Sequence, residues 1–220
     1  MTPLGRVYRD RAEAGRVLAT DLRQYAGRDD VIVLGLPRGG VPVAAEVASA
    51  LEAPIDVFVV RKLGVPGHAE LAMGAIAGGG VRVLNPAVVD TLGISDGVID
   101  EVAAREAQEL ARRLHTYRGD RPAPELGGRI VIVVDDGLAT GATMKAAVAA
   151  IRAARPARIV VAVPVGARPT CDELEASADE VVCAKVPALF QAVGQWYQDF
   201  SPTTDEEIST LLAAQRPAAD

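Results

Sequence analysis

The segment from Ile130 to Met144, IVIVVDDGLATGATM, restricts the fold more than any other part of the chain. Its first five residues are β-branched, which is typical of a buried strand. Asp135 and Asp136 follow the strand, and a loop of small residues leads into a helix predicted to end near Ala154. N–H groups at the start of a helix attract phosphate, because they lack intrahelical partners and the dipole is positive there. Paired carboxylates can accept hydrogen bonds from a vicinal diol or hold a divalent cation through water, so the segment suits a sugar phosphate.

Short apolar runs alternate with helical patterns along the rest of the chain. Besides 130–134, strands are predicted at 31–35, 55–60, 158–163 and 180–184, and helices at 9–26 and 41–51. Such alternation predicts an α/β fold in which a doubly wound, Rossmann-like parallel sheet is flanked by helices on both faces. The ligand is then expected at the carboxyl ends of the strands.

Residues 62–128 interrupt this alternation. Small residues over 64–80 predict a mobile loop with a short hairpin at 75–84, and Ser95 is a suitable N-cap for a helix that ends near Tyr117. The segment contains too few apolar residues for a core of its own. We therefore expect a single domain over 1–220. Its core is predicted at about 28–62 and 128–186, its insertion at about 63–127, and a C-terminal hood at 187–220 that ends in a helix over 205–215.

Composition excludes several classes of function. The 220-residue chain has a net charge of −6, which opposes broad attraction to nucleic acid. No apolar run is long enough to span a membrane and no signal-peptide pattern is present, so we expect a soluble, cytoplasmic protein. Cys171 and Cys183 are the only cysteines, and with the two histidines distant from them no zinc pattern exists. We expect these cysteines to be reduced thiols, although a disulfide is the alternative.

The segment 130–143 resembles the 5-phosphoribosyl-1-pyrophosphate (PRPP) signature of the type I phosphoribosyltransferases. The resemblance implies transfer of a 5-phosphoribosyl group from PRPP to a nitrogenous acceptor such as a nucleobase, with release of pyrophosphate and dependence on Mg²⁺. It implies that Asp135 and Asp136 bind the ribose hydroxyls and hold the metal through these hydroxyls or through water. The residues implied in binding the 5-phosphate are Ala139, Thr140, Gly141, Ala142 and Thr143. Two alternatives are a plain Asp-Asp-Gly turn with a threonine cap, and a non-catalytic regulatory protein that binds PRPP or a nucleotide.

A second loop, GLPRGGVP, follows the strand predicted at 31–35. Close glycines between a strand and a helix can bind an anion, and Arg38 offers a planar donor for phosphate oxygens. The loop resembles the family's pyrophosphate loop, which implies that Pro37, Arg38, Gly39 and Gly40 bind pyrophosphate. Several relatives carry a cis peptide bond there, so we predict that the bond between Pro37 and Arg38 is cis. An ordinary turn after a strand is the alternative.

Arg61 and Lys62 match by position the family's cations that face pyrophosphate, because they follow the strand predicted at 55–60. The glycine-rich stretch 64–80 matches the family's flexible catalytic loop, and its titratable members are His68 and Glu70. Solvated residues at a strand end and on a loop are the alternative for all four. Relatives that act on 6-oxopurines carry an aspartate at the position of Ala139. The alanine found here instead resembles the adenine-using branch of the family. In that branch the mobile loop supplies a carboxylate, which makes Glu70 a catalytic candidate.

The acceptor side is sought near the C-terminus, where aromatic residues gather. By resemblance, Lys185 and Phe190 are candidates for contacting the acceptor base, whereas we expect Trp196 and Phe200 to pack in the core. The segments Arg9-Asp10-Arg11 and Tyr117-Arg118-Gly119 resemble a subgroup of bacterial phosphoribosyltransferase-like proteins whose substrate is unsettled. Homodimers are common in the family, so a homodimer is expected.

Overall fold

The computed structural model describes residues 7–214, except for the side chains of residues 69 and 70. A five-stranded parallel sheet has the order β2-β1-β6-β7-β8. These strands are β1 (Val31–Gly35), β2 (Ile55–Val57), β6 (Ile130–Val134), β7 (Arg158–Val163) and β8 (Glu180–Cys183). The predicted α/β class and parallel sheet are thus confirmed.

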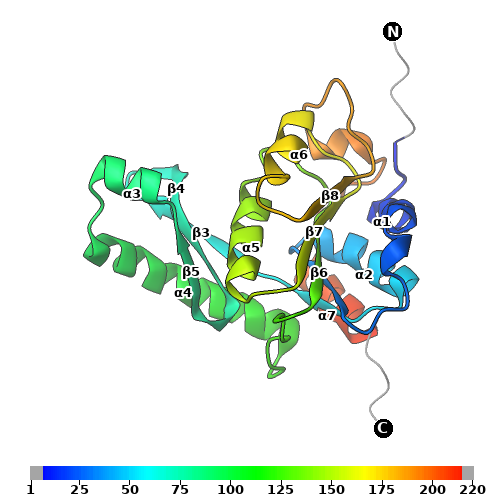
Figure 1. Cartoon of the computed structure of the whole chain (residues 1–220), viewed down its shortest axis with the longest axis horizontal. Coiled ribbons are helices and arrows are strands. Elements are labelled where there is room, and N and C mark those ends of the chain that lie inside the picture. Colours follow the sequence, from blue (N-terminus) through cyan, green and yellow to red (C-terminus); the bar gives the residue numbers. More distant parts are fainter. Residues whose placement is uncertain (1–6, 215–220) are drawn as a thin grey trace.

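Helices cover both faces of this sheet. On one face lie α1 (Arg11–Asp21) and α2 (Gly40–Leu51), and on the other lie α5 (Ala142–Ala153) and α6 (Arg168–Leu174). Figure 1 shows the strands β6, β7 and β8 beside α5. Alternate residues of β1 point to opposite faces, so Val33 packs with α1 and α2 while Leu34 packs toward α5. Burial on both faces explains why these strands are continuous apolar runs.

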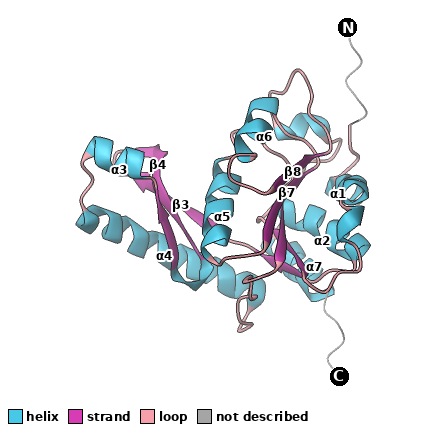
Figure 2. Ribbon diagram, in the orientation of Figure 1, coloured by secondary structure: helices cyan, strands magenta, loops and turns pink. Residues whose placement is uncertain are grey.

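The strand predicted at 55–60 is wrong at its carboxyl end. Only residues 55–57 pair with β1, and after Phe58 and Val59 the chain enters a second sheet of order β3-β4-β5. This sheet is antiparallel, with β3 (Val60–Val65), β4 (His68–Ala77) and β5 (Val81–Leu84). Figure 2 shows these strands lying along α4, apart from the parallel sheet.

The stretch predicted as a mobile loop at 64–80 is therefore largely strand, and the hairpin predicted at 75–84 is part of a larger meander. The small residues serve close packing there. A side chain at Gly74 would place its Cβ 2.4 Å from the carbonyl oxygen of Val83 on the neighbouring strand. Buried Leu63 and Met73 anchor the sheet in a cluster with residues of α4. Glycine residues in a sequence can thus indicate close packing of neighbouring strands as well as a mobile loop.

Two helices pack with the antiparallel sheet, and together with it they form what we call the second unit, residues 60–118. They are α3 (Pro86–Leu92) and the 23-residue α4 (Asp96–Arg118), which begins after Ser95 as predicted. Arg118 returns to the parallel sheet, where its Nε lies 3.0 Å from both carboxylate oxygens of Asp56 and its Nη2 donates to the carbonyl of Val57. Both side chains of this ion pair are buried. The end of α4 is therefore bound to β2, the strand after which the chain leaves the parallel sheet.

The remaining elements are short. They are the 3₁₀ turns η1 (Arg23–Tyr25), η2 (Gly78–Gly80) and η3 (Val193–Trp196), and the helix α7 (Asp205–Ala214), which packs against α4 and α2. The helix predicted at 9–26 is shorter and continues as η1, and residue 215, the predicted end of the last helix, lies outside the described residues. Across residues 7–214, no helix is both long and apolar enough to cross a membrane.

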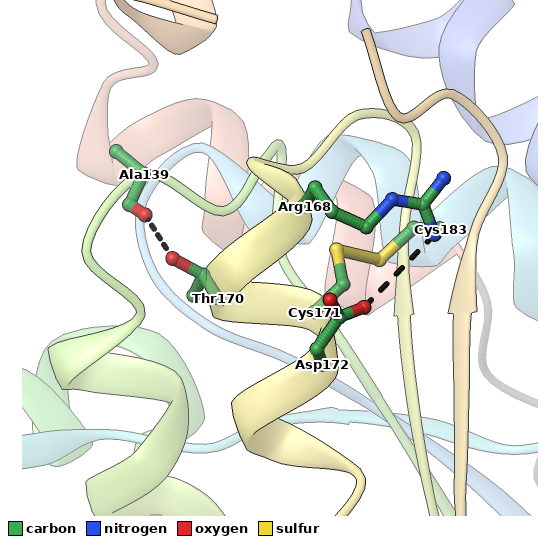
Figure 3. The surroundings of a disulfide bond; sticks show 6 residues. All are labelled: Ala139, Arg168, Thr170, Cys171, Asp172 and Cys183. Atoms are coloured by element: carbon green, nitrogen blue, oxygen red, sulfur yellow. Dashed lines mark hydrogen bonds and ion pairs between the residues drawn. A yellow bond between two sulfur atoms is a disulfide. The ribbon is translucent and has the colours of Figure 1, made fainter. Parts of the chain in front are cut away.

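The prediction of reduced cysteines is wrong, because Cys171 on α6 and Cys183 on β8 form a disulfide (Figure 3). Helix α6 lies over β8, which brings together two residues that are 12 positions apart. The sulfur atoms pack on Gly166, where an added Cβ would lie 2.5 Å from the Sγ of Cys171. The disulfide therefore fixes α6 beside the loop that follows β7.

Candidate functional site

Asp135 and Asp136 lie directly against the loop of Arg38, Gly39 and Gly40. The strands that carry the two segments are neighbours, with Gly35 of β1 in register with Val134 of β6. A Cβ on Gly39 would lie 2.0 Å from Oδ2 of Asp136, and one on Gly40 would lie 3.1 Å from Oδ1 of Asp135. Glycine is needed at Gly39 because the carboxylate of Asp136 occupies that space. At Gly40 it is needed chiefly because the backbone carbonyl oxygen of Val134 would lie 2.6 Å from a Cβ.

The surroundings of the two carboxyl groups disfavour their charged forms. Burial raises the pKa of Asp135 well above its usual range, and the neighbouring charge of Asp136 raises it further. Burial also raises the pKa of Asp136, while Arg11 opposes that shift. Oδ1 of Asp135 accepts the backbone N–H of Asp136 at 2.8 Å. The carboxyl end of β6 thus holds two negative groups in a site that disfavours both charges.

Arg11 is the principal site residue that the sequence analysis missed. Its Nε and Nη2 lie 2.9 and 2.8 Å from Oδ2 of Asp136, and its Nη1 donates to the carbonyl of Ser201. The guanidinium lies over the ring of Phe200, 4.1 Å from the centroid. The sequence analysis named Arg11 only as part of a resemblance to a subgroup. No pattern in the sequence indicates that it contacts Asp136, which is 125 positions away.

The hood closes over this pair with aromatic side chains. The hydroxyl of Tyr197 donates to the backbone carbonyl of Asp136 at 2.6 Å, and burial raises the pKa of this tyrosine. Trp196 is buried, as predicted. Phe200 is 37% exposed, so its predicted place in the core is wrong, because its ring is the surface on which Arg11 lies.

The loop after the two aspartates is held from outside by the segment that follows β7. Leu138 exchanges backbone hydrogen bonds with Val165 and Ala167, and the hydroxyl of Thr170 donates to the carbonyl of Ala139 at 2.6 Å (Figure 3). Gly141 precedes α5 with a positive φ of 68°. Among the described residues, the backbone N–H groups of 139–143 find no acceptor. Five donors at the start of a 12-residue helix are thus available to an anion.

Arg38 stands on the other side of the aspartates. The peptide bond between Pro37 and Arg38 is cis, as predicted. The Arg38 side chain is exposed, and within the described part of the chain it makes no hydrogen bond or ion pair. It lines a hollow of about 230 Å³ together with Arg112 and Arg113 of α4.

The structure does not bring Arg61 and Lys62 to the aspartates. Both lie on β3, and they line a separate hollow with Arg105 and Glu106 of α4. Nε of Arg61 donates to Glu106 at 2.9 Å. Their predicted place at the end of a parallel strand fails because the chain leaves that sheet after residue 57.

The remaining candidates lie on other elements than the paired carboxylates. His68 is exposed at the start of β4, and the side chain of Glu70 lies outside the described residues. Nζ of Lys185 lies 3.4 Å from the centroid of the Tyr8 ring, and Phe190 packs against the cluster that contains Tyr8 and Trp196. Phe190 thus belongs to the hood, Lys185 lies just before it, and contact with an acceptor remains a prediction for both.

The site provides few groups for a metal ion. Residues 7–214 contain no cluster of three histidine, cysteine or carboxylate side chains with a described position. Mg²⁺ commonly binds through one or two carboxylates together with water and substrate phosphates. Asp135 and Asp136 fit that pattern, provided that the substrate brings the remaining oxygens.

Comparisons with a family model and with known proteins all point to the same family. The family model described as a phosphoribosyl transferase domain matches residues 7–199. Two proteins from strains of Mycobacterium tuberculosis, provisionally named phosphoribosyl transferases, are each 50% identical to the chain over 94% of its length. The chain spans about half the length of these relatives (46%).

Solved structures share the architecture. The crystal structure of TT1426 from Thermus thermophilus is 43% identical, with a TM-score of 0.86 over 96% of this chain and 100% of that one. The AQ2163 protein from Aquifex aeolicus is 13% identical, with a TM-score of 0.50 over 84% of this chain and 78% of that one. The second likeness concerns the fold alone.

Proposed function

The chain belongs to the phosphoribosyl transferase domain family, and we propose that it transfers the 5-phosphoribosyl group of PRPP to a nitrogenous acceptor, releasing pyrophosphate. A nucleobase is the first acceptor to test. The observation that carries the proposal is the position of Asp135 and Asp136 between two elements whose free donors suit an anion. The unpaired N–H groups of 139–143 lie on one side, and the loop of Arg38 lies on the other.

The oxygens of the two carboxylates suit a vicinal diol. Oδ1 of Asp135 and Oδ2 of Asp136 already accept protein donors. Within residues 7–214, Oδ2 of Asp135 and Oδ1 of Asp136 have no hydrogen-bond donor. One oxygen on each carboxylate is thus left for one ribose hydroxyl each. The loop at 139–143 would hold the 5-phosphate, so that binding energy remote from C1 aligns the reacting bond.

The same groups support the chemistry. The bond between C1 and pyrophosphate breaks as a nitrogen of the acceptor attacks C1, and positive charge develops on the ribose ring. The carboxylates of Asp135 and Asp136 favour that charge, because they are fixed before the reaction begins. The guanidinium of Arg38 would stabilise the departing pyrophosphate. Mg²⁺, when held through Asp135, Asp136 and substrate oxygens, would neutralise part of the diphosphate charge.

Calorimetry with PRPP in the presence of Mg²⁺ tests binding. Release of pyrophosphate with adenine, guanine, hypoxanthine, xanthine, uracil or orotate tests turnover. The double variant Asp135→Asn/Asp136→Asn should lose turnover and bind PRPP weakly while remaining folded. Asp172→Asn, on an exposed face of α6, is the matched control and should behave like the wild type. Full turnover by the double variant would refute the roles of the two carboxylates.

A regulatory protein that binds PRPP or a nucleotide without turnover is the second candidate. It is favoured by one observation, the ion pair of Arg11 with Asp136, because that pair neutralises a carboxylate which the reaction would use. Tight PRPP binding without pyrophosphate release from any of the six bases would support this candidate. Mg²⁺ dependence and a homodimer remain parts of the first proposal, to be tested by chelation and by light scattering.

A further inference from the structure

We propose that Arg112 and Arg113 of α4 complete, with Arg38, a binding site for a diphosphate group. The proposal rests on the proposed function for the identity of the anion, which is the pyrophosphate of PRPP. It assigns the cationic partners of Arg38 to α4, whereas the resemblance of the sequence placed them at Arg61 and Lys62. The hollow at which these three arginines meet has a volume of about 230 Å³, and Pro37, Tyr117 and Asp205 also line it.

The first argument is the state of Arg38. Most arginines near the site are engaged, such as Arg11 with Asp136 and Arg118 with Asp56. Arg38, in contrast, has no acceptor within the described residues. It nevertheless lines one small hollow together with two further arginines. Like charges gathered around one hollow repel one another, and a bound anion relieves that repulsion.

The second argument is that the pairing on α4 leaves donors unused. Arg112 donates through Nε and Nη2 to Glu109, while Arg113 donates to the same glutamate through Nε alone. These contacts between residues three and four positions apart are ordinary helix-surface pairs. They leave both terminal nitrogens of Arg113 without an acceptor in the described part of the chain. Those nitrogens form a planar pair of donors, the geometry that binds phosphate oxygens in bidentate fashion.

The third argument is the charge balance. The hydroxyl of Tyr117 donates to Asp205 at 2.8 Å, so this carboxylate has a partner inside the hollow. Counting Glu109 and Asp205 against the three arginines leaves one positive charge uncompensated. A carboxylate on one wall also sets an orientation, because an anion is favoured on the wall formed by the arginines.

The fourth argument is position. Gly39, the residue after Arg38, has its α-carbon beside the carboxylate of Asp136. The loop that lines the hollow through Pro37 and Arg38 thus also contacts, through Gly39, the carboxylate proposed to bind a ribose hydroxyl. A sugar held at the carboxylates would project a diphosphate on C1 toward Arg38, and the oxygens beyond it would reach α4. The helix of the second unit would thereby become part of the substrate site.

Calorimetric titration with inorganic pyrophosphate, in Mg²⁺ at fixed ionic strength, tests this site. Ribose 5-phosphate serves as the probe for the loop at 139–143. The double variant Arg112→Gln/Arg113→Gln should raise the Kd for pyrophosphate at least tenfold and change the Kd for ribose 5-phosphate less than twofold. The variant Arg112→Gln/Arg113→Lys, which restores one positive charge, should bind pyrophosphate more tightly than the double glutamine variant. The control is Arg105→Gln, which removes a positive charge on the same helix at the other hollow.

The outcomes separate this proposal from the proposed function. The subsite is refuted if the double variant binds pyrophosphate as tightly as the wild type, if Arg105→Gln weakens binding equally, or if the wild type does not bind pyrophosphate. Circular dichroism and the melting temperature establish that the variants are folded. Binding of pyrophosphate that depends on Arg112 and Arg113, without any binding of PRPP or ribose 5-phosphate, would support the subsite and refute the proposed function.

Discussion

Arg11 directs two nitrogens at a single oxygen, Oδ2, of Asp136, at 2.9 and 2.8 Å. The pair joins the first turn of α1 to the end of β6, and both side chains are largely buried. Because only one oxygen is occupied, the other stays available to a ligand. Arg11 therefore sustains a charged carboxylate in a buried position without blocking it.

Replacing Arg11 with glutamine should destabilise the protein by about 3 kcal/mol at pH 7, because a buried carboxylate loses its counter-ion. Without Arg11 the pKa of Asp136 rises further above its unfolded value. The deficit should therefore be largest at neutral pH and shrink as the pH falls and the carboxyl protonates. Urea unfolding at pH 7 and pH 4.5 measures both effects. Arg16 lies on α1 like Arg11 and makes an exposed pair with Glu46 of α2. Arg16→Gln should therefore cost under about 1 kcal/mol, and equal losses for the two variants would contradict this account.

Asp135→Asn should make the fold more stable than the wild type at pH 7. Burial raises the pKa of Asp135, so its contribution to stability is full below the unfolded pKa and is lost as the pH rises through the folded pKa. Asparagine has no such penalty, and its carbonyl oxygen can still accept the N–H of Asp136. Denaturant unfolding between pH 4 and pH 8 should show the two stabilities converging at the acid end. A constant difference across this range would mean that ionisation of Asp135 is not the cause.

Gly39→Ala should weaken PRPP binding and destabilise the protein by roughly 1–3 kcal/mol, because the new methyl group overlaps the Asp136 carboxylate. Moving that carboxylate aside would break its bonds to Arg11. Gly97→Ala on α4 is the matched control. No atom lies within 4 Å of the position that a Cβ would take at Gly97, so alanine should be neutral or stabilising by up to about 1 kcal/mol. Calorimetry and thermal melting compare the two, and a neutral Gly39→Ala would mean that the loop moves freely.

Reduction of the Cys171–Cys183 disulfide should lower the free energy of unfolding by about 3 kcal/mol, the loss expected for opening a loop of 12 residues. Urea unfolding with and without dithiothreitol measures this change. The double variant Cys171→Ser/Cys183→Ser should match the reduced protein and be insensitive to the reductant. Because Thr170 bonds the carbonyl of Ala139, we also expect weaker ribose 5-phosphate binding after reduction. Identical unfolding curves would show that the bond contributes nothing to stability.

Local patterns in the sequence predicted the centre of this fold correctly. The strands β1 and β6 are uninterrupted apolar runs, and each is followed by residues whose type restricts the loop. Parallel pairing of neighbouring strands then brings Asp135 and Asp136 to Gly39 without further information. The cis bond before Arg38 was predicted from resemblance alone, since no local pattern of residues indicates it.

Contacts between distant residues could not be predicted in this way. The run at 55–60 is apolar almost throughout, so nothing in it indicates that the chain changes sheets after Val57. Gly74 reads as flexible, although the neighbouring strand is what excludes a side chain there. Arg11 meets Asp136, and Arg113 shares a hollow with Arg38, only because α1 and α4 pack where they do.

The bond between Asp56 and Arg118 has a consequence for how this family can diversify. After Val57 the chain leaves the parallel sheet, and Arg118 brings it back beside the same strand, at Asp56. A segment whose ends meet can be lengthened, trimmed or exchanged as a cassette without rerouting the strands that remain. An engineer could thus exchange the antiparallel sheet and α4 while the strands that carry Asp135, Asp136 and the loop at 139–143 keep their places.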